Sequence, residues 1–338
     1  RDQPRSRGLG DVYKRQLSKD NPWRLVVTYD DTRAKEIFDD FSYFEPNTWL
    51  YPARDLLFYS SDIHGNLLTR QRMQVFKHLL EDEGGVVVTT VDGLMDHLLP
   101  LSRIKESCLN IMVGQTLDME EIKHLLTGMG YERMGQVDGM GQFSVRGGIL
   151  DVFPLTEEVP VRIELWGDEV DSIRSFDAES QRSIENLEEI TIYPATEVVL
   201  DKETIRQGIK AIEKEAQKSQ KKFRDEMKTE EGARVRQIAA ELKDQLEEME
   251  HIAGAESFVR YFYKKTESLL EYLPENTLVV IDEPNRLTEH AKTTEEEFRE
   301  SMIHRLEKGY LLPGQMEVIR NHQEVVHRFH QMLSLIHI

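Results

Sequence analysis

Residues 143–177 read FSVRGGILDVFPLTEEVPVRIELWGDEVDSIRSFD, and this stretch constrains the fold more than any other. Gly147 and Gly148 can supply a turn or bulge, because glycine takes positive φ without strain. Gly167 begins a Gly-Asp pair that suits a tight hairpin turn. Prolines bound the segments between these turns. The stretch therefore predicts a run of consecutive antiparallel strands.

The segment VRIELW within this stretch alternates between two kinds of residue, as a half-buried strand does. Val161, Ile163 and Leu165 should face the core. That leaves Arg162 and Trp166 together on the face that would normally be exposed to water. Trp and Arg are the residue types richest in interface hot spots, so this face is a candidate binding surface. The alternative is a tryptophan that lies under a neighbouring helix.

The two ends of the chain do not look native. Residues 11–16 (DVYKRQ) and 333–338 (LSLIHI) can be encoded by DNA strings that are reverse complements of each other. The shared string resembles the transposon end used in sequencing libraries. We therefore expect residues 1–16 and 333–338 to be read-through that lies outside the fold. The remaining residues, 17–332, are then expected to be an internal fragment of a longer chain.

The composition is acidic, with 62 Asp and Glu against 43 Lys and Arg and a formal net charge of −19. A surface of this sign repels phosphate backbones, so the chain as a whole is not expected to grip DNA. The single cysteine, Cys108, excludes an internal disulfide and fits a reducing compartment. No apolar run approaches the roughly 18 residues of a membrane span. These features favour a cytoplasmic protein that does not act at a membrane.

The pattern of elements changes along the chain. Residues 17–114 alternate strands and helices, with CLNIMVG as a fourth strand, which is typical of a doubly wound parallel sheet. Residues 115–196 read as an inserted α+β domain. Residues 197–332 begin as a helical region and resume the α/β pattern of strands and helices at TLVVIDEPNRL. We interpret the charged helices within residues 201–272 as a solvated hairpin with i,i+4 ion pairs, and a partner-binding or nucleic-acid-binding arm is the alternative.

The strand LVVIDEP ends in Asp282 and Glu283, like the magnesium-holding strand of a P-loop ATPase. That chemistry also needs the string GxxxxGK[ST] to hold the phosphates, and residues 17–332 lack it. We interpret Asp282 and Glu283 as acidic residues at the end of a buried strand. The alternatives are a site that has lost its function and half of a site whose loop lies upstream.

Two other groups of residues were candidates for chemistry. Three histidines fall on one predicted helix, but no cysteine or carboxylate cluster supports a metal site there. These histidines are His322, His327 and His330. Asp171, Asp177 and Glu179 could form an acid/base set, but nothing places them in a cleft. We therefore predict no catalytic residue and no metal site in this chain.

Several motifs carry a family resemblance: FSVRGGILDVFP, VRIELWGDEVDSIRSFD and ITIYPA. They closely resemble the inserted domain of the bacterial transcription-repair coupling factors, and more loosely that of UvrB, the excision-repair helicase. The resemblance extends over essentially all of residues 17–332. ARDLLFYSSDIHGN is much shorter than the DNA-gripping hairpin of UvrB, and DEPN stands where UvrB has DESH. The charged linker helices are also unlike those of UvrB.

The resemblance implies a UvrB-like, split P-loop-type α/β domain. Its halves, domain 1a (residues 17–114) and domain 1b (residues 197–332), would pair in space. Domain 2 (residues 115–196) would be inserted between them. In the coupling factors this module looks like an ATPase relic, which would make Asp282 and Glu283 a degenerate remnant.

The resemblance also implies a binding site in domain 2. The residues that contact UvrA in the family are two arginines and an aromatic residue. They fall here on Arg146, Arg162 and Trp166. The aromatic residue is usually phenylalanine, so Trp166 departs from the pattern.

We therefore expect a UvrA-recruiting N-terminal module that has no ATPase activity and no cofactor of its own. The parent protein would use ATP and Mg²⁺ as a DNA translocase and would couple displacement of stalled RNA polymerase to nucleotide excision repair. RNA polymerase and double-stranded DNA would bind to other regions, and the parent's C-terminal domains would contact this module. The alternatives are a fragment of a UvrB-type ATP-dependent helicase, or a scaffold that packs on the parent's motor.

Overall fold

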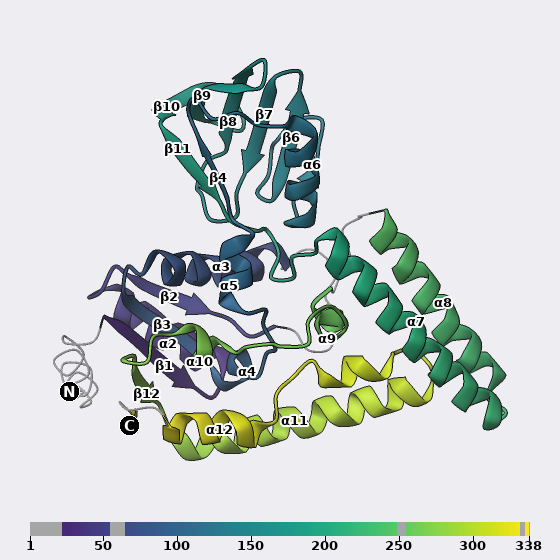
Figure 1. The fold of residues 1–338 in the computed structure, drawn as a ribbon. Coiled ribbons are helices and arrows are strands. Elements are labelled where there is room, and N and C mark those ends of the chain that lie inside the picture. The colour runs from purple at the N-terminus through teal and green to yellow at the C-terminus, as the bar shows by residue number, and fades with distance from the viewer. Residues whose placement is uncertain (1–21, 55–64, 249–254, 332–334, 338) are drawn as a thin grey trace, which may run out of the picture.

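A parallel sheet forms the base of the molecule in the computed structural model, which describes residues 22–54, 65–248, 255–331 and 335–337 (Figure 1). Its strand order is β13-β12-β1-β3-β2. Nearly every residue of the three inner strands is buried, as expected for strands that are covered on both faces. The strands of the sheet, apart from β13, are β1 (Trp23–Thr28), β2 (Thr48–Tyr51), β3 (Gly85–Thr90) and β12 (Leu278–Ile281).

Helices cover both faces of the parallel sheet. On one face, Ala34 and Ile37 of α2 (Asp31–Ser42) pack against the strands. On the other face, α3 (Gly65–Glu81), α4 (Val91–Leu94) and α5 (Leu101–Glu106) enclose the larger core. The alternating strands and helices therefore form the two-sided α/β layer that the sequence predicts.

The strand β12 completes this sheet from far along the chain. It pairs in parallel with β1, with Leu278 opposite Arg24 and Ile281 opposite Val27. The long helix α11 (Pro284–Glu307) follows it directly, and α12 (His322–Gln331) packs back against α11. The strand within TLVVIDEPNRL therefore joins the same parallel sheet as β1.

The described residues between β4 (Leu109–Met112) and α7 (Lys202–Asp225) contain a second sheet of six strands, in the order β10-β9-β8-β7-β6-β5. It stands apart from the parallel sheet (Figure 1). Gly147 and Gly167 have φ of 61° and 66° at two of its hairpin turns, as the sequence predicts. Its strands are β5 (Glu132–Arg133), β6 (Gln142–Arg146), β7 (Ile149–Phe153), β8 (Val161–Trp166), β9 (Glu169–Phe176) and β10 (Ser183–Leu187).

One face of the second sheet carries its core. Val161 and Ile163 are buried there, together with residues of α6 (Met119–Gly128). The predicted inward direction of the aliphatic residues in VRIELW is therefore confirmed for these two positions, and the half-buried Leu165 packs against the same core. The opposite face carries polar side chains, among them Asp151, Arg162 and Glu164.

The prediction for CLNIMVG was wrong. We expected a fourth strand of the parallel sheet, but β4 (Leu109–Met112) pairs antiparallel with β11 (Glu189–Ile192). Only Ile111 is fully buried in β4, and its neighbours on either side are exposed. That alternation is typical of a half-covered antiparallel strand, whereas inner parallel strands are apolar on both faces.

The charged region forms a helical hairpin of α7 (Lys202–Asp225) and α8 (Thr229–Glu247), as predicted. Short elements connect it to β12 and follow α11. These are η1 (Ala255–Phe258), α9 (Val259–Phe262), α10 (Leu269–Tyr272) and η2 (Pro313–Glu317). None of the helices in the described ranges is long and apolar enough to span a membrane.

The C-terminal residues differ from expectation. We expected residues 333–338 to contribute nothing to the fold, but β13 (Leu335–His337) pairs in parallel with β12 at the edge of the sheet. The backbone of an edge strand offers unpaired N–H and C=O groups to any extended segment nearby. Residues 1–16, the proposed N-terminal read-through, lie outside the described ranges.

Candidate functional site

The polar face of the second sheet brings together two of the predicted site residues. Arg146 ends β6, Arg162 lies on β8, and β7 runs between them. Asp151 of β7 stands directly opposite Arg162 in the register. Both arginines reach this one carboxylate, so the structure places them side by side as predicted.

Asp151 is the residue that fixes this arrangement, and sequence reasoning missed it. Its side chain is 1% exposed. It accepts bonds from Arg162 Nε at 2.7 Å and Nη2 at 2.8 Å, and from Arg146 Nη2 at 2.8 Å. A carboxylate inside the apolar strand ILDVF is a visible signal, because a buried acid requires a cationic partner. The partners themselves depend on strand register.

Arg162 is held more firmly than Arg146. Its Nη2 also donates to Gln181 Oε1 at 3.0 Å, and its guanidinium lies 4.6 Å from the centre of the Phe176 ring. The hydrogen bonds with Asp151 raise the pKa of the Arg162 guanidinium. The Arg162 side chain is 17% exposed, whereas that of Arg146 is 48% exposed. Arg162 is therefore part of the domain's structure as well as of its surface.

Trp166 lies at the end of β8, where Gly167 turns the chain into β9. It is 85% exposed, so the alternative that it packs under a neighbouring helix is wrong. A large aromatic ring held in water on a rigid hairpin is available for a partner. Glu164 and Arg174 form an ion pair on the strands between Trp166 and the arginine pair.

Asp282 and Glu283 are occupied by neighbouring side chains. The Asp282 carboxylate is nearly buried and accepts bonds from Arg33 Nε at 2.9 Å and Thr28 Oγ1 at 3.3 Å. Its bond with Asp282 raises the pKa of the Arg33 guanidinium. Glu283 precedes α11 with a φ of 50° and pairs with Arg286 at 3.0 Å. Both carboxylates therefore have ionic partners within the chain, Asp282 in a buried position and Glu283 in an exposed one.

The other candidate groups stay dispersed. His322 Nδ1 lies 2.6 Å from Glu295 Oε2, and His327 contacts Gln331. The side chain of His330 lies outside the described ranges. Asp171, Asp177 and Glu179 are exposed, as expected for surface charge. Among the described residues one group, His78, Glu81 and Glu83, brings potential ligand atoms within 4.8 Å of one another.

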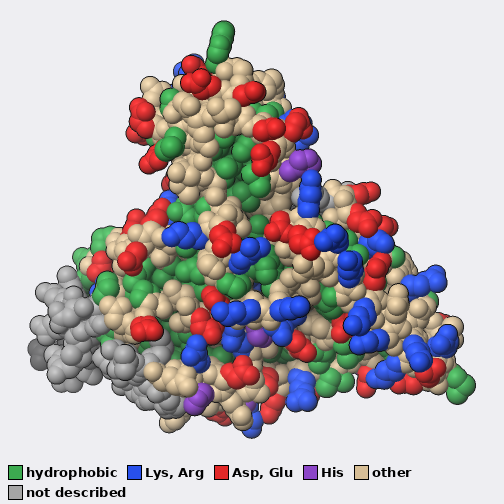
Figure 2. Space-filling model, viewed as in Figure 1, with side chains coloured by type: hydrophobic (Ala, Val, Ile, Leu, Met, Phe, Trp, Pro, Cys, Tyr) green, Lys and Arg blue, Asp and Glu red, His purple; other side chains and the backbone are tan. Residues whose placement is uncertain are grey.

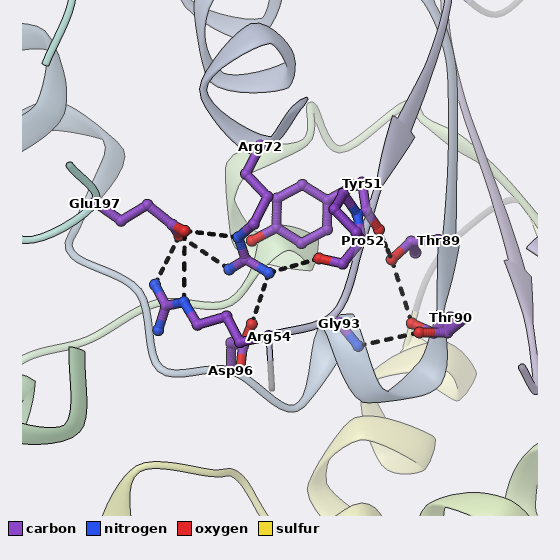
Figure 3. A network of polar contacts seen from close by, with 9 residues as sticks. All are labelled: Tyr51, Pro52, Arg54, Arg72, Thr89, Thr90, Gly93, Asp96 and Glu197. Atoms are coloured by element: carbon purple, nitrogen blue, oxygen red, sulfur yellow. Dashed lines mark hydrogen bonds and ion pairs between the residues drawn. The ribbon is translucent and has the colours of Figure 1, made fainter. Parts of the chain in front are cut away.

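A buried charge network anchors the chain where it leaves the second sheet (Figure 3). Arg72 of α3 donates to both oxygens of Glu197, at 2.7 and 2.9 Å, and contacts Asp96 Oδ2 at 2.8 Å. Arg54 donates to Glu197 at 2.7 Å. Burial alone would raise the pKa of the Glu197 carboxyl, but Arg54 and Arg72 outweigh burial and lower the pKa to about 2.

Comparisons with known proteins agree with this arrangement. Residues 109–198 match the family model described as the UvrB interaction domain. This match spans β4, α6, the second sheet and β11, and ends one residue after Glu197. This part of the chain is therefore similar to the UvrB interaction domains, and we use that name for residues 109–198.

The relatives extend the similarity over most of the chain. A Transcription-repair-coupling factor of Bacillus subtilis (strain 168) is 34% identical over 291 residues, which cover 85% of this chain and 24% of that protein. Those of Staphylococcus epidermidis (strain RP62A) and Staphylococcus haemolyticus are 29% and 30% identical over 306 and 315 residues, with 88% of this chain and 25% of each relative covered. The chain is thus related to the transcription-repair coupling factors and spans about a quarter of their length. The resemblance that the motifs indicate is confirmed.

Proposed function

We propose that this chain is the N-terminal, UvrA-recruiting module of a transcription-repair coupling factor. The observation that carries the proposal is the polar face of the UvrB interaction domain. There, one buried carboxylate holds two arginines, and an exposed tryptophan lies on the next hairpin. We define Arg146, Arg162 and Trp166 as the recruitment face.

The recruitment face suits a partner that offers carboxylates beside an apolar pocket. Asp151 fixes the guanidinium of Arg162 before binding, so less side-chain entropy is lost on association. Arg146 is half exposed and keeps N–H groups for charge-assisted bonds with a partner carboxylate. Trp166 adds apolar area at low entropic cost.

We infer a UvrB-like division of the chain from the same observations. Domain 1a (residues 17–114) and domain 1b (residues 197–332) would share the parallel sheet, and the pairing of β12 with β1 supports this. Domain 2 (residues 115–196) would be the insertion, and the match over residues 109–198 supports a start a few residues earlier.

The activity of the parent protein is also part of the proposal. It would be a cytoplasmic, ATP- and Mg²⁺-dependent DNA translocase that displaces stalled RNA polymerase and brings in nucleotide excision repair. RNA polymerase and the double-stranded DNA on which the motor acts would bind to other regions, and its C-terminal domains would contact this module. The identity of the relatives as Transcription-repair-coupling factors supports this assignment over a UvrB-type helicase.

Trp166→Ala tests the recruitment face most cleanly. We expect it to weaken UvrA binding roughly 30-fold, which corresponds to about 2 kcal/mol, because it removes an interface anchor. The free energy of unfolding should not change, because the ring is 85% exposed. Titration calorimetry with UvrA and urea denaturation measure the two effects.

A matched control for Trp166 is Ile184→Ala, which removes another exposed apolar side chain from the same sheet. It should bind UvrA like the unmodified chain. Wild-type affinity in Trp166→Ala, or an equal loss in both variants, would remove the recruitment face from the proposal.

We expect the chain to show no saturable ATP binding in calorimetry with Mg²⁺. Asp282, the residue that would hold the metal in an ATPase, is paired with Arg33 and Thr28. Arg33→Ala frees the carboxylate but supplies no phosphate-binding loop, so that variant should not bind ATP either. Saturable heat that Asp282→Ala abolishes would instead favour the UvrB-type helicase.

A further inference from the structure

The helical hairpin separates its charges by face. The outward side of α7 carries lysines at regular spacing, whereas the sequence as a whole is strongly acidic. The lysines are exposed, and we call them the α7 lysine face: Lys210, Lys214, Lys218 and Lys221. In the view of Figure 2, Lys and Arg side chains gather over α7. The expectation of a hairpin covered by i,i+4 ion pairs does not describe this side of α7.

Three acidic residues of α7 have partners other than the lysines of this face. Glu203 pairs with Arg206, and Glu213 pairs with Lys243 of α8 at 2.9 Å. Glu215 accepts bonds from Tyr261 Oη and from the Gly314 backbone N–H. Within the described ranges, no carboxylate lies within ion-pair distance of any lysine of the α7 lysine face. Their charge is therefore left for a partner.

A hollow in the surface lies beside the α7 lysine face and shares Lys214 and Lys218 with it. Its volume is about 290 Å³, and it lies between α7, α9 and η2. Its charged lining consists of Lys214, Lys218, Arg260, Glu215 and Glu317. Arg260 Nε is buried and has no hydrogen-bond partner, and its Nη2 is only 3.4 Å from Glu317 Oε2. Three cationic side chains against two carboxylates give this hollow a net positive lining, which favours an oxyanion.

We propose that the α7 lysine face and the Arg260 hollow bind the phosphate backbone of duplex nucleic acid without reading its sequence. Lysines four residues apart on a helix are about 6 Å apart along its axis, so successive ammonium groups can follow successive phosphates of one strand. Arg260 adds a positive charge beside Lys214 and Lys218. This surface is separate from the recruitment face.

The composition of the surface favours phosphate over an acidic protein. Protein interfaces are depleted in lysine and enriched in aromatic residues. Between Lys210 and Lys221 the exposed positions of α7 carry no aromatic or large apolar side chain. Lysine acts as a hydrated point charge and suits backbone contacts that do not depend on sequence. The acidic remainder of the chain restricts such contacts to this one face.

Fluorescence anisotropy with a labelled duplex of about 20 base pairs tests the proposal on the whole chain. About four phosphate contacts predict that the affinity falls roughly 100-fold between about 50 and 200 mM salt. Two duplexes of unrelated sequence should bind alike. Lys214→Gln with Lys218→Gln should weaken binding at least about tenfold at the lower salt and reduce the log–log salt slope by about 2.

Two further variants make the test specific. Glu317→Gln removes the carboxylate that competes for Arg260, so it should tighten binding several-fold. Lys35→Gln with Lys292→Gln makes the same change in net charge on α2 and α11, and it should leave affinity unchanged. Circular dichroism confirms that each variant is folded.

Several outcomes would overturn the proposal. These are no saturable binding of either duplex, equal losses in the two double-lysine variants, or polyglutamate that competes as well as DNA at equal charge. The last result would assign the surface to an acidic protein instead. None of these outcomes bears on the recruitment face, which is tested with UvrA.

Discussion

Arg72→Ala is expected to lower the free energy of unfolding by about 3–5 kcal/mol, because it leaves the buried Asp96 without a cation and Glu197 with Arg54 alone. The Arg72 side chain is 1% exposed and contacts Glu197 and Asp96, which are also buried. Its guanidinium further donates to the carbonyl of Pro52 at 2.8 Å and lies 4.1 Å from the centre of the Tyr51 ring. Alanine removes all of these contacts at once.

Urea denaturation of Arg72→Ala and Arg70→Ala measures this effect against a matched control. Arg70 lies on the same helix, but its partner Glu158 is exposed. Exposed pairs contribute about 1 kcal/mol or less. Similar losses in the two variants would show that the buried network does not dominate stability here.

The network should also appear in the pH dependence of stability. The pKa of Glu197 is lowered from 4.5 to about 2 in the folded chain. The folded state therefore holds its proton less tightly than the unfolded state does. The stabilisation is complete above the unfolded pKa and is lost as the pH falls from about 4.5 to about 2. In the Glu197→Gln variant, the part of the pH dependence of stability that comes from Glu197 should be absent.

The network has a consequence for the placement of the UvrB interaction domain. Glu197 lies at the end of the family match, whereas Arg54 and Arg72 belong to the α/β layer. The carboxylate is thus held by the layer from which the domain projects. When the chain is held to the α/β layer at Glu197, the orientation of the domain's binding face is defined. A defined orientation favours the recruitment of a partner.

Local patterns in the sequence predicted the second sheet well. Alternation in VRIELW and glycines that can take positive φ act over a few residues, and β8 with its turn at Gly167 followed from them. The same local reasoning failed for β4, because a short apolar run does not state which sheet it joins. Pairing depends on residues far along the chain.

The contacts that fix the candidate sites were the least predictable. Arg33 and Asp282 meet because β12 lies beside β1, and Arg72 meets Glu197 after the whole inserted domain has intervened. Neither pair has a spacing that a sequence pattern can show. By contrast, strand parity alone predicted that Trp166 points outward, and the structure adds that no helix covers it, because it is 85% exposed. Burial is predictable from local alternation, whereas the choice of ionic partner is not.

Asp151→Ala is expected to lower the free energy of unfolding by about 3 kcal/mol, since it removes the carboxylate that two arginines share. The guanidinium of Arg162 would remain largely buried without its anion. Asp171→Ala, an exposed aspartate on the neighbouring strand β9, should have no such effect. Hydrogen exchange of β7 and β8 separates a loss within this domain from one in the parallel sheet.

The same contacts refine the expectation for Arg162. From the sequence, Arg162→Ala should weaken UvrA binding and leave the fold intact. The structure adds that Arg162 neutralises Asp151, so Arg162→Ala should reduce both binding and stability. Ile163→Ala, which empties a core position, should reduce stability by about 2–5 kcal/mol and spare the affinity of the folded fraction. If Asp151→Ala is as stable as the unmodified chain, the arginines are not held by this carboxylate, and a preformed recruitment face loses its basis.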